Sequence, residues 1–265
     1  MLVKEIGEFG LIKRIAQRIK TDRSVIQGIG DDCAVLEFSK DKYQLFTCDM
    51  LVEGVDFLKN TDPFLIGRKA LAVSVSDIAA CAGIPRYCLV SLGLPPDTSV
   101  DFVDRFLKGM LGIAKEYAIN ITGGDVSRAP QISVDGSMLG VVEKRRLLLR
   151  SGALKGDIIF VSGSLGGSLS GKHLKFKPRI KEARYLTKSF KVNAMIDISD
   201  GLIQDLGHIL KASKTGAMLY EEMIPLSTQA KGLKSALYDG EDFELLFTVP
   251  VLEARKIIFR NRDLF

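Results

Sequence analysis

The chain has 265 residues, 46% of them hydrophobic and 26% charged, a balance that is typical of globular proteins and excludes a disordered or fibrous chain. The net charge of +5 comes from basic residues spread along the sequence, without the aromatic-interleaved basic stripe of a polyanion-binding protein, so we expect no nucleic acid partner. No apolar run approaches the roughly 20 residues of a membrane span, and the first residues lack a signal-peptide cleavage site, so we expect a cytoplasmic protein with no membrane partner.

The first predicted element is an amphipathic helix over residues 4–20. Its apolar side chains recur at helical spacing and are expected to pack on the core; they are Ile6, Phe9, Ile12, Ile15, Ala16 and Ile19. A second helix is predicted to begin at Asp62, a plausible N-cap before Pro63, and to end at a turn over residues 83–86.

A strand over residues 87–95 and a long helix over residues 101–118 follow. The helix is predicted to turn one apolar face inward, made of Phe102, Phe106, Met110, Ile113 and Ala114. A strand, a loop and a strand are then expected over residues 120–143. The glycine-rich and charged stretch at residues 150–157 reads as a connector, so we predict two domains, residues 1–148 and residues 149–265.

The second half opens with a predicted strand over residues 157–163 and a glycine–serine loop over residues 163–171. Residues 194–213 pass from strand to loop to helix, with Asp197, Asp200 and Asp205 around the turn. A last strand is predicted over residues 244–250, followed by a helix that starts near residue 252.

The four cysteines, Cys33, Cys48, Cys81 and Cys88, each lie in an apolar stretch and have no C-x-x-C spacing. The pattern is that of buried free thiols, and it indicates neither a zinc site nor a disulfide framework.

One familiar phosphate-binding motif is disfavoured. The glycine–serine loop matches the spacing of a P-loop from Gly166 through Gly171 to Lys172, but His173 stands where a P-loop needs serine or threonine. A P-loop also needs a helix whose N-terminal amides face the phosphates, and Pro178 follows too soon. The two histidines lie far apart in sequence and no serine sits in a G-x-S-x-G elbow, so a hydrolytic triad has little support.

The informative pattern is the placing of the aspartates. Six motifs put a carboxylate beside an apolar segment: GIGDDCAV, TCDMLVEG, SVSDIAA, TGGDVSR, DISDGL and DGEDFE. Carboxylates are costly to desolvate unless they are paired or bound to a cation, so converging turns of this kind predict a site for Mg²⁺. The alternative is that Asp, Gly and Ser serve only as turn formers and helix caps.

Taken together, the motifs resemble the thiamine-monophosphate kinase family, within the AIR-synthase-like ATP-binding superfamily. The likeness spans nearly the whole chain, with GIGDDCAV, T-x-D before LVEGV, SDIAA, ITGGDVSRAP, RSGALKGD, DISDGL and GEDFELLFT in the family's order. The resemblance implies an α+β fold of two AIR-synthase-like domains. The N-terminal α+β domain would pair its strands with a second subunit in a dimer barrel, and a shortened C-terminal α/β domain would pack against it.

By position, the resemblance also implies site residues. Magnesium ligands would be Asp32, Asp49, Asp77, Asp125, Asp197 and Asp200, with further oxygens from Thr47 and Cys48. Nucleotide contacts would be Gly124, Asp125, Arg150 and Ser199, and acceptor contacts would be Asp56, Glu241 and Asp242.

The implied activity is transfer of the γ-phosphoryl group of ATP to thiamine monophosphate, with Mg²⁺ as cofactor and a homodimer as the assembly. Such a transfer depends on alignment and charge neutralisation, so no catalytic group beyond the metal-binding carboxylates is required. Three departures bear on the acceptor: Asp56 stands where the family has histidine, the stretches 164–195 and 210–238 are shorter than in the family, and the chain ends soon after FTVP. The alternatives are a superfamily enzyme acting on another phosphate, carboxylate or amide, and a non-catalytic nucleotide-binding dimer.

Overall fold

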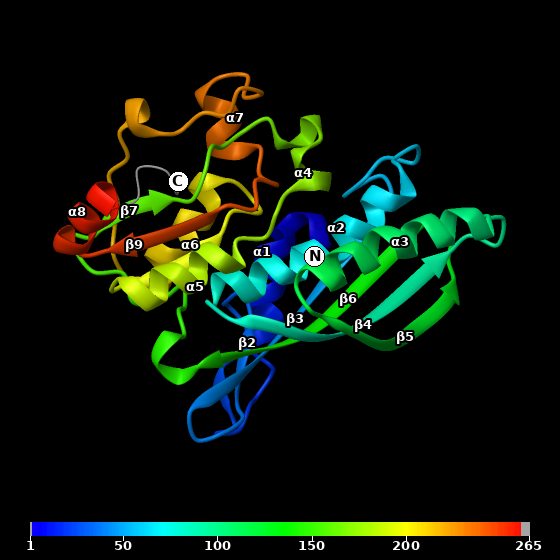
Figure 1. The fold of residues 1–265 in the computed structure, drawn as a ribbon, viewed down its shortest axis with the longest axis horizontal. Coiled ribbons are helices and arrows are strands. Elements are labelled where there is room, and N and C mark those ends of the chain that lie inside the picture. Colours follow the sequence, from blue (N-terminus) through cyan, green and yellow to red (C-terminus); the bar gives the residue numbers. More distant parts are fainter. Residues whose placement is uncertain (1, 261–265) are drawn as a thin grey trace.

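A computed structural model describes residues 2–260 and contains two sheets with helices packed on them (Figure 1). The larger sheet has six strands, in the spatial order β1 (Val25–Gln27), β2 (Ala34–Glu37), β3 (Lys42–Val52), β6 (Ser133–Glu143), β4 (Ile84–Leu94) and β5 (Asn120–Arg128). Neighbouring strands are antiparallel except for the parallel pair β4 and β5. The smaller sheet is antiparallel, in the order β7 (Ile158–Val161), β9 (Leu245–Val249) and β8 (Ala194–Asp197).

Two long helices, α2 (Pro63–Ala80) and α3 (Val100–Glu116), lie along one face of the larger sheet (Figure 1). Asp62 and Ser99 cap their first turns by accepting backbone N–H groups, as the sequence predicts for Asp62. The two helices cross closely at a pair of glycines. A Cβ on Gly67 would lie 1.9 Å from the carbonyl oxygen of Phe106, and one on Gly109 would lie 1.9 Å from that of Phe64, so only glycine allows this approach.

The remaining helices belong mainly to the second half: α4 (Lys172–Lys175), α5 (Ile180–Ser189), α6 (Leu202–Ser213), α7 (Leu233–Tyr238) and α8 (Val251–Arg260). Short 3-10 turns lie at Lys144–Arg146, Ser168–Ser170 and Glu221–Met223. Helix α2 is buried along most of its length because it contacts the larger sheet on one side and α4, α5 and β8 on the other. One helix therefore joins the two halves of the molecule.

The predicted elements are largely confirmed. The helices near residues 63 and 101, the strand–loop–helix at 194–213 and the last strand all form. The turn predicted at residues 83–86 is wrong, since β4 already begins at Ile84 and the chain reverses at Ala82, which has a left-handed φ of 55°. The domain boundary between residues 148 and 149 stays a prediction, and residues 261–265 lie outside the described part.

The first helix, α1 (Val3–Ala16), forms, but its expected packing is wrong. None of its residues is buried, and Phe9, Ile12 and Ile15 keep about two fifths of their surface exposed. Gly7 has φ 64° and breaks the helix, so the apolar stripe is not continuous. The helix contacts α6 through the rings of Phe9 and His208, whose centroids are 5.1 Å apart. No helix in residues 2–260 is both long and apolar enough to cross a bilayer.

Candidate active site

A cage of carboxylates lies where the two halves of the molecule meet. Oxygens of Asp32, Asp77 and Asp197 all lie within 4.8 Å of one another. Asp32 follows β1, Asp77 is in the last turns of α2 and Asp197 is the final residue of β8. The cage therefore forms only when the smaller sheet packs against α2.

Strand β3 and helix α2 place further polar groups around the cage. Thr47 and Asp49 face α2, where the Thr47 hydroxyl donates to Asp77 and the Ser74 hydroxyl donates to Asp49 over 2.7 Å. The Ser76 hydroxyl donates to Asp197 over 2.5 Å. These hydroxyls orient the carboxylates without adding charge, so the negative charge of the cage stays uncompensated on this side.

The carboxyl groups of the cage have raised pKa values. Burial is the largest cause for each of them, and repulsion from neighbouring carboxylates adds to it. The pKa rises to about 6 for Asp32 and Asp49, to about 7 for Asp197, and well above its usual range for Asp77. Carboxylates crowded together in this way favour the binding of either a proton or a metal cation.

The donor set fits a hard divalent cation. Oδ1 of Asp32 accepts from Arg150, but Oδ2 is buried and has no hydrogen-bond partner within the described residues. A buried polar atom without a partner calls for an explanation, and carboxylate oxygens are the ligands that Mg²⁺ prefers. The geometry thus brings together five of the predicted ligands: Asp32, Thr47, Asp49, Asp77 and Asp197.

Arg150 lies at the edge of the cage. Its Nη2 is 2.6 Å from Oδ1 of Asp32, and its backbone N–H donates to Asp31 over 3.1 Å. Its side chain is four fifths buried. A guanidinium beside a carboxylate cage is well placed to take a phosphate oxygen once a cation shares the Asp32 charge.

Cys48 and Asp125 lie on the other face of the larger sheet. Alternation along β3 turns Cys48 away from α2, so it is exposed, contrary to the expectation of a buried thiol, and its Sγ donates to Asp135 over 3.0 Å. Asp125 lines a surface pocket of about 250 Å³ together with Met50 and Asp135. Their predicted ligand roles therefore do not follow from the cage and stay predictions.

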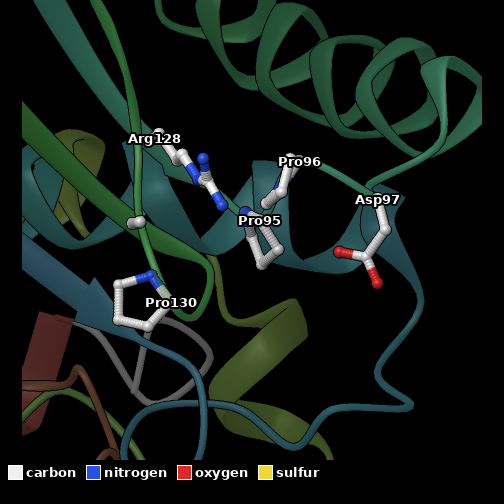
Figure 2. Close-up of a pocket in the computed structure, with 6 residues that line it drawn as sticks. Pro95, Pro96, Asp97, Arg128 and Pro130 are labelled. Atoms are coloured by element: carbon white, nitrogen blue, oxygen red, sulfur yellow. The ribbon is translucent and has the colours of Figure 1, made fainter.

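A second surface pocket, of about 480 Å³, lies at the ends of β4 and β5 beside the first (Figure 2). It is lined by Pro95, Pro96, Asp97, Arg128, Ala129 and Pro130. Arg128 and Ala129 line both pockets, so the two adjoin next to Asp125. Its lining combines three prolines with one basic and one acidic side chain, Arg128 and Asp97.

Gly124 and Ser199, the other predicted nucleotide contacts, have visible structural roles. A Cβ on Gly124 would lie 1.7 Å from the carbonyl oxygen of Val90, so the close pairing of β5 with β4 requires glycine. The carbonyl of Ser199 accepts the N–H of Glu241 over 2.7 Å. Asp200, a predicted metal ligand, is exposed and accepts from the Gln204 amide.

The predicted acceptor residues separate into two kinds. Asp56 and Glu241 are partly buried; Asp56 accepts the N–H of Val52 over 2.7 Å and Glu241 accepts from Lys69. Asp242 is fully buried and accepts from the Gly166 N–H and the Ser168 hydroxyl. Asp242 thus holds the glycine–serine loop in place.

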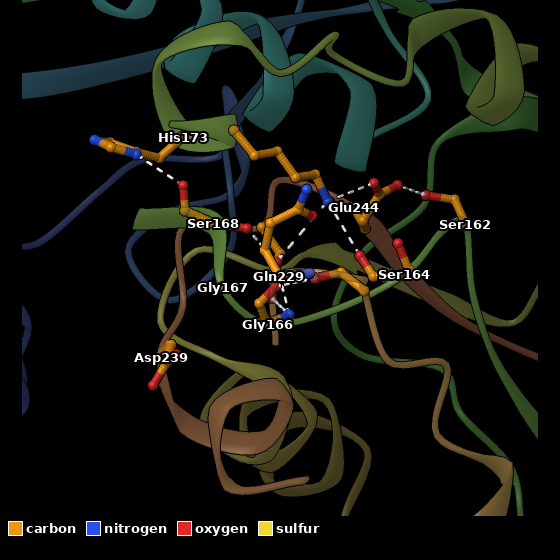
Figure 3. A network of polar contacts seen from close by, with 12 residues as sticks. Ser162, Ser164, Gly166, Gly167, Ser168, His173, Gln229, Asp239 and Glu244 are labelled. Atoms are coloured by element: carbon orange, nitrogen blue, oxygen red, sulfur yellow. Dashed lines mark hydrogen bonds and ion pairs between the residues drawn. The ribbon is translucent and has the colours of Figure 1, made fainter. Parts of the chain in front are cut away.

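That loop is tied down by a network of polar contacts around Glu244 (Figure 3). The Glu244 carboxylate accepts from Arg179 through two nitrogens, at 2.8 and 2.9 Å, and from Lys172 at 2.9 Å. Burial raises the pKa of Glu244, but the hydrogen bonds and charges of Arg179 and Lys172 outweigh it and the net shift is downward. Lys172 is engaged here and α4 is only 4 residues long, so the P-loop interpretation is excluded.

Glu244→Gln is expected to lower the free energy of unfolding by roughly 2 to 4 kcal/mol, because it leaves two cations facing a neutral partner inside the protein. Glu182→Gln is the matched control, since Glu182 also pairs with Arg179 but is more exposed; its cost should stay below about 1 kcal/mol. Urea denaturation monitored by circular dichroism measures both. Equal costs for the two variants would contradict a structural role for Glu244.

Comparison with known proteins identifies the family of this chain. Residues 30–142 match the family model "AIR synthase related protein, N-terminal domain", and residues 138–254 match "AIR synthase related protein, C-terminal domain". The thiamine-monophosphate kinase of Aquifex aeolicus is 36% identical over 94% of this chain and 88% of its own length. The chain belongs to the thiamine-monophosphate kinase family.

Other members of the family match similarly. The thiamine-monophosphate kinase of Escherichia coli K12 is 37% identical over 93% of this chain and 83% of its own length. The structure of AaThiL complexed with AMPPCP and TMP superposes with a TM-score of 0.88 at 35% identity, covering 96% of this chain and 88% of that one. The hydrogenase maturation protein HypE in complex with ATP, 18% identical with a TM-score of 0.72, shares the fold.

Sequence reasoning missed the residues that support the cage. Ser74 and Ser76 bind Asp49 and Asp197, and Lys69 binds Glu241, all from α2. The available signal was that these three polar side chains lie within a largely apolar helix. Such residues are buried at a cost unless they have partners.

Proposed function

We propose that this protein transfers the γ-phosphoryl group of ATP to thiamine monophosphate, giving ADP and thiamine diphosphate. The observation that carries the proposal is the carboxylate cage between the two halves, with an unpartnered buried oxygen, in a chain of the thiamine-monophosphate kinase family. The complex of AaThiL with AMPPCP and TMP supports the same pair of substrates.

We further propose that Mg²⁺ binds in the cage, held by Asp32, Asp49, Asp77 and Asp197, with Thr47 beside them and with waters and phosphate oxygens completing the shell. When bound, magnesium neutralises charge on the phosphates and aligns them. Arg150 would bind a phosphate oxygen of the nucleotide. The terminal oxygen of a phosphate monoester is largely ionised near neutral pH, so the acceptor needs no general base from the chain.

The direct test incubates the purified protein with magnesium, ATP and thiamine monophosphate and follows thiamine diphosphate by chromatography. Product is expected at catalytic enzyme concentrations. If none forms at micromolar enzyme while another phosphate, carboxylate or amide compound stimulates ATP turnover, the acceptor is different. If nucleotide binds and no acceptor stimulates turnover, the chain is a nucleotide-binding protein without transfer activity.

We also propose a homodimer through the outer face of the larger sheet. This face, opposite α2, exposes large apolar side chains on the two strands that flank β6: Phe46 and Met50 on β3, and Tyr87 and Leu89 on β4. Leu139 of β6 lies in register between Phe46 and Tyr87. A contiguous apolar patch of this kind is typical of an interaction surface. The pairing of sheets between two subunits that the family resemblance implies would cover it.

Leu89→Asp is therefore expected to give a monomer, because it places a charge in the middle of the apolar patch. Val100→Asp is the control, since Val100 is even more exposed but lies at the start of α3. Light scattering coupled to size-exclusion chromatography measures the mass of each. A wild-type monomer, or a Leu89→Asp dimer, would contradict the proposed interface.

A further inference from the structure

Lys69 is a lysine buried in the interior of the protein. Its exposed fraction is 0%, and it belongs to α2 at the place where that helix meets both halves of the chain. Burying an ammonium group is unfavourable unless partners replace its water. The partners of the Lys69 ammonium must therefore offset the cost of its burial.

Within residues 2–260, the Lys69 ammonium has two hydrogen-bond partners. It donates to the carbonyl oxygen of Asp56 over 3.0 Å and to the carboxylate of Glu241. Asp56 follows β3 in the first half, and Glu241 precedes β9 in the second half. One ammonium group thus joins the two segments that the sequence assigns to the acceptor.

The Glu241 segment is held in an unusual conformation. Glu241 and Phe243 have left-handed φ values of 57° and 49°, a backbone conformation that is unfavourable for non-glycine residues. The segment is fixed by N–H groups of Glu241 and Phe243 donating to the carbonyls of Ser199 and Ile198, at 2.7 and 2.8 Å. Strain of this kind, maintained by surrounding contacts, is typical of functional loops.

The same helix face also supports the carboxylate cage. Lys69 and Ser76 are seven residues apart, nearly two helical turns, so they share a face about 10 Å apart along the axis. Ser76 binds Asp197 in the cage, whereas Lys69 binds Glu241. Helix α2 therefore sets the distance between the cage and the acceptor segments.

One carboxylate oxygen of Glu241 is available to bind a ligand. Oε2 is bound by Lys69, no hydrogen bond within residues 2–260 holds Oε1, and a quarter of the side chain is exposed. With one oxygen anchored, the other points in a fixed direction. A fixed anionic oxygen suits an acceptor that carries a cationic ring and amino groups.

We propose that Lys69 is a positioning residue for the acceptor: it orients the Glu241 carboxylate and locks the Asp56 segment against it. This inference rests on the proposed function and adds a residue of the acceptor half. Lys69 acts through Glu241 and the Asp56 backbone, and neither of these is a predicted nucleotide contact. Its loss should therefore weaken acceptor binding and spare ATP binding.

The test compares steady-state kinetics of Lys69→Met, which keeps the length of the side chain and removes its charge, with the wild type. The KM for thiamine monophosphate should rise at least tenfold, with the KM for ATP within about twofold. Lys108→Met is the control, because Lys108 is exposed on α3; both KM values should stay unchanged. A purely structural role predicts a lower melting temperature with both KM values unaltered.

A second variant covers the case in which Lys69→Met does not fold. Glu241→Gln keeps the shape and an acceptor for Lys69, and it should raise the KM for thiamine monophosphate by a similar factor. In the double variant the two effects should not add, since both remove the same anchored carboxylate.

The outcomes separate the two proposals. If the wild type neither binds nor phosphorylates thiamine monophosphate, the proposed function fails and the acceptor role of Lys69 fails with it. If the wild type is active and Lys69→Met and Glu241→Gln leave the acceptor KM unchanged, or raise both KM values equally, only the Lys69 inference is overturned.

Discussion

Asp77→Asn is expected to lower the rate of phosphoryl transfer at least about a thousandfold, equivalent to roughly 4 kcal/mol of transition-state stabilisation. Asp77 faces Asp32 and Asp197 across the cage; Asp32 and Asp197 are buried and Asp77 is half-buried. The asparagine side chain has the same shape but lacks the charge that holds a divalent cation. Initial rates at saturating ATP and magnesium measure the effect.

The folded state of this variant should not suffer. Removing one of several mutually repelling carboxylates relieves repulsion, so the melting temperature of metal-free Asp77→Asn should equal or exceed that of the wild type. Asp157→Asn is the matched control, because Asp157 accepts from Asn193 at a distance from the cage and should keep its full activity. Loss of activity accompanied by unfolding would count against the cage as a metal site.

Magnesium is expected to stabilise the protein strongly at about pH 8 and weakly at about pH 5.5. The pKa values of Asp32, Asp49, Asp77 and Asp197 are raised in the folded state, so the folded protein holds protons that the unfolded chain releases. The stabilisation from these protons is present below about pH 4 and is lost as the pH rises toward 7 and beyond.

Metal-free protein should therefore melt at a lower temperature at the higher pH. A cation replaces the protons there, so saturating magnesium should raise the melting temperature by at least about 5 °C at pH 8 and by much less at the lower pH. Differential scanning calorimetry with and without chelator measures the four temperatures. An equal magnesium effect at both values would mean that the ion binds elsewhere.

Some regular elements of the second half could be predicted from the sequence, whereas α5 and α7 were not predicted. Residues 194–213 carry a β-branched and apolar strand, a D-x-x-D-G turn and an apolar period of 3.6, and the structure has β8, a turn and α6 there. Local periodicity determines such elements because each is stabilised by one continuous apolar face. The same reasoning overestimated α1, where Gly7 interrupts the face and no core residue covers it.

The sequence predicted that a cation site exists, but it did not predict which carboxylates form it. Carboxylates beside strand ends predicted a cation site, because charge at such places needs compensation. Which of them converge was a matter of packing: β3 alternates, so Asp49 faces α2 whereas Cys48 faces outward. No local pattern distinguishes the two faces before the sheet is covered by a helix.

The sequence by itself determined the order of the acidic motifs, the family they indicate and the residue types available for binding a cation. Only the tertiary structure decided that α2 lies between the two halves, so that Asp77 and Ser76 meet Asp197 while Lys69 meets Glu241. A lysine within an apolar helix can extend to solvent or be buried with a carboxylate. The choice depends on a partner 172 residues away in the chain, which only folding brings into contact.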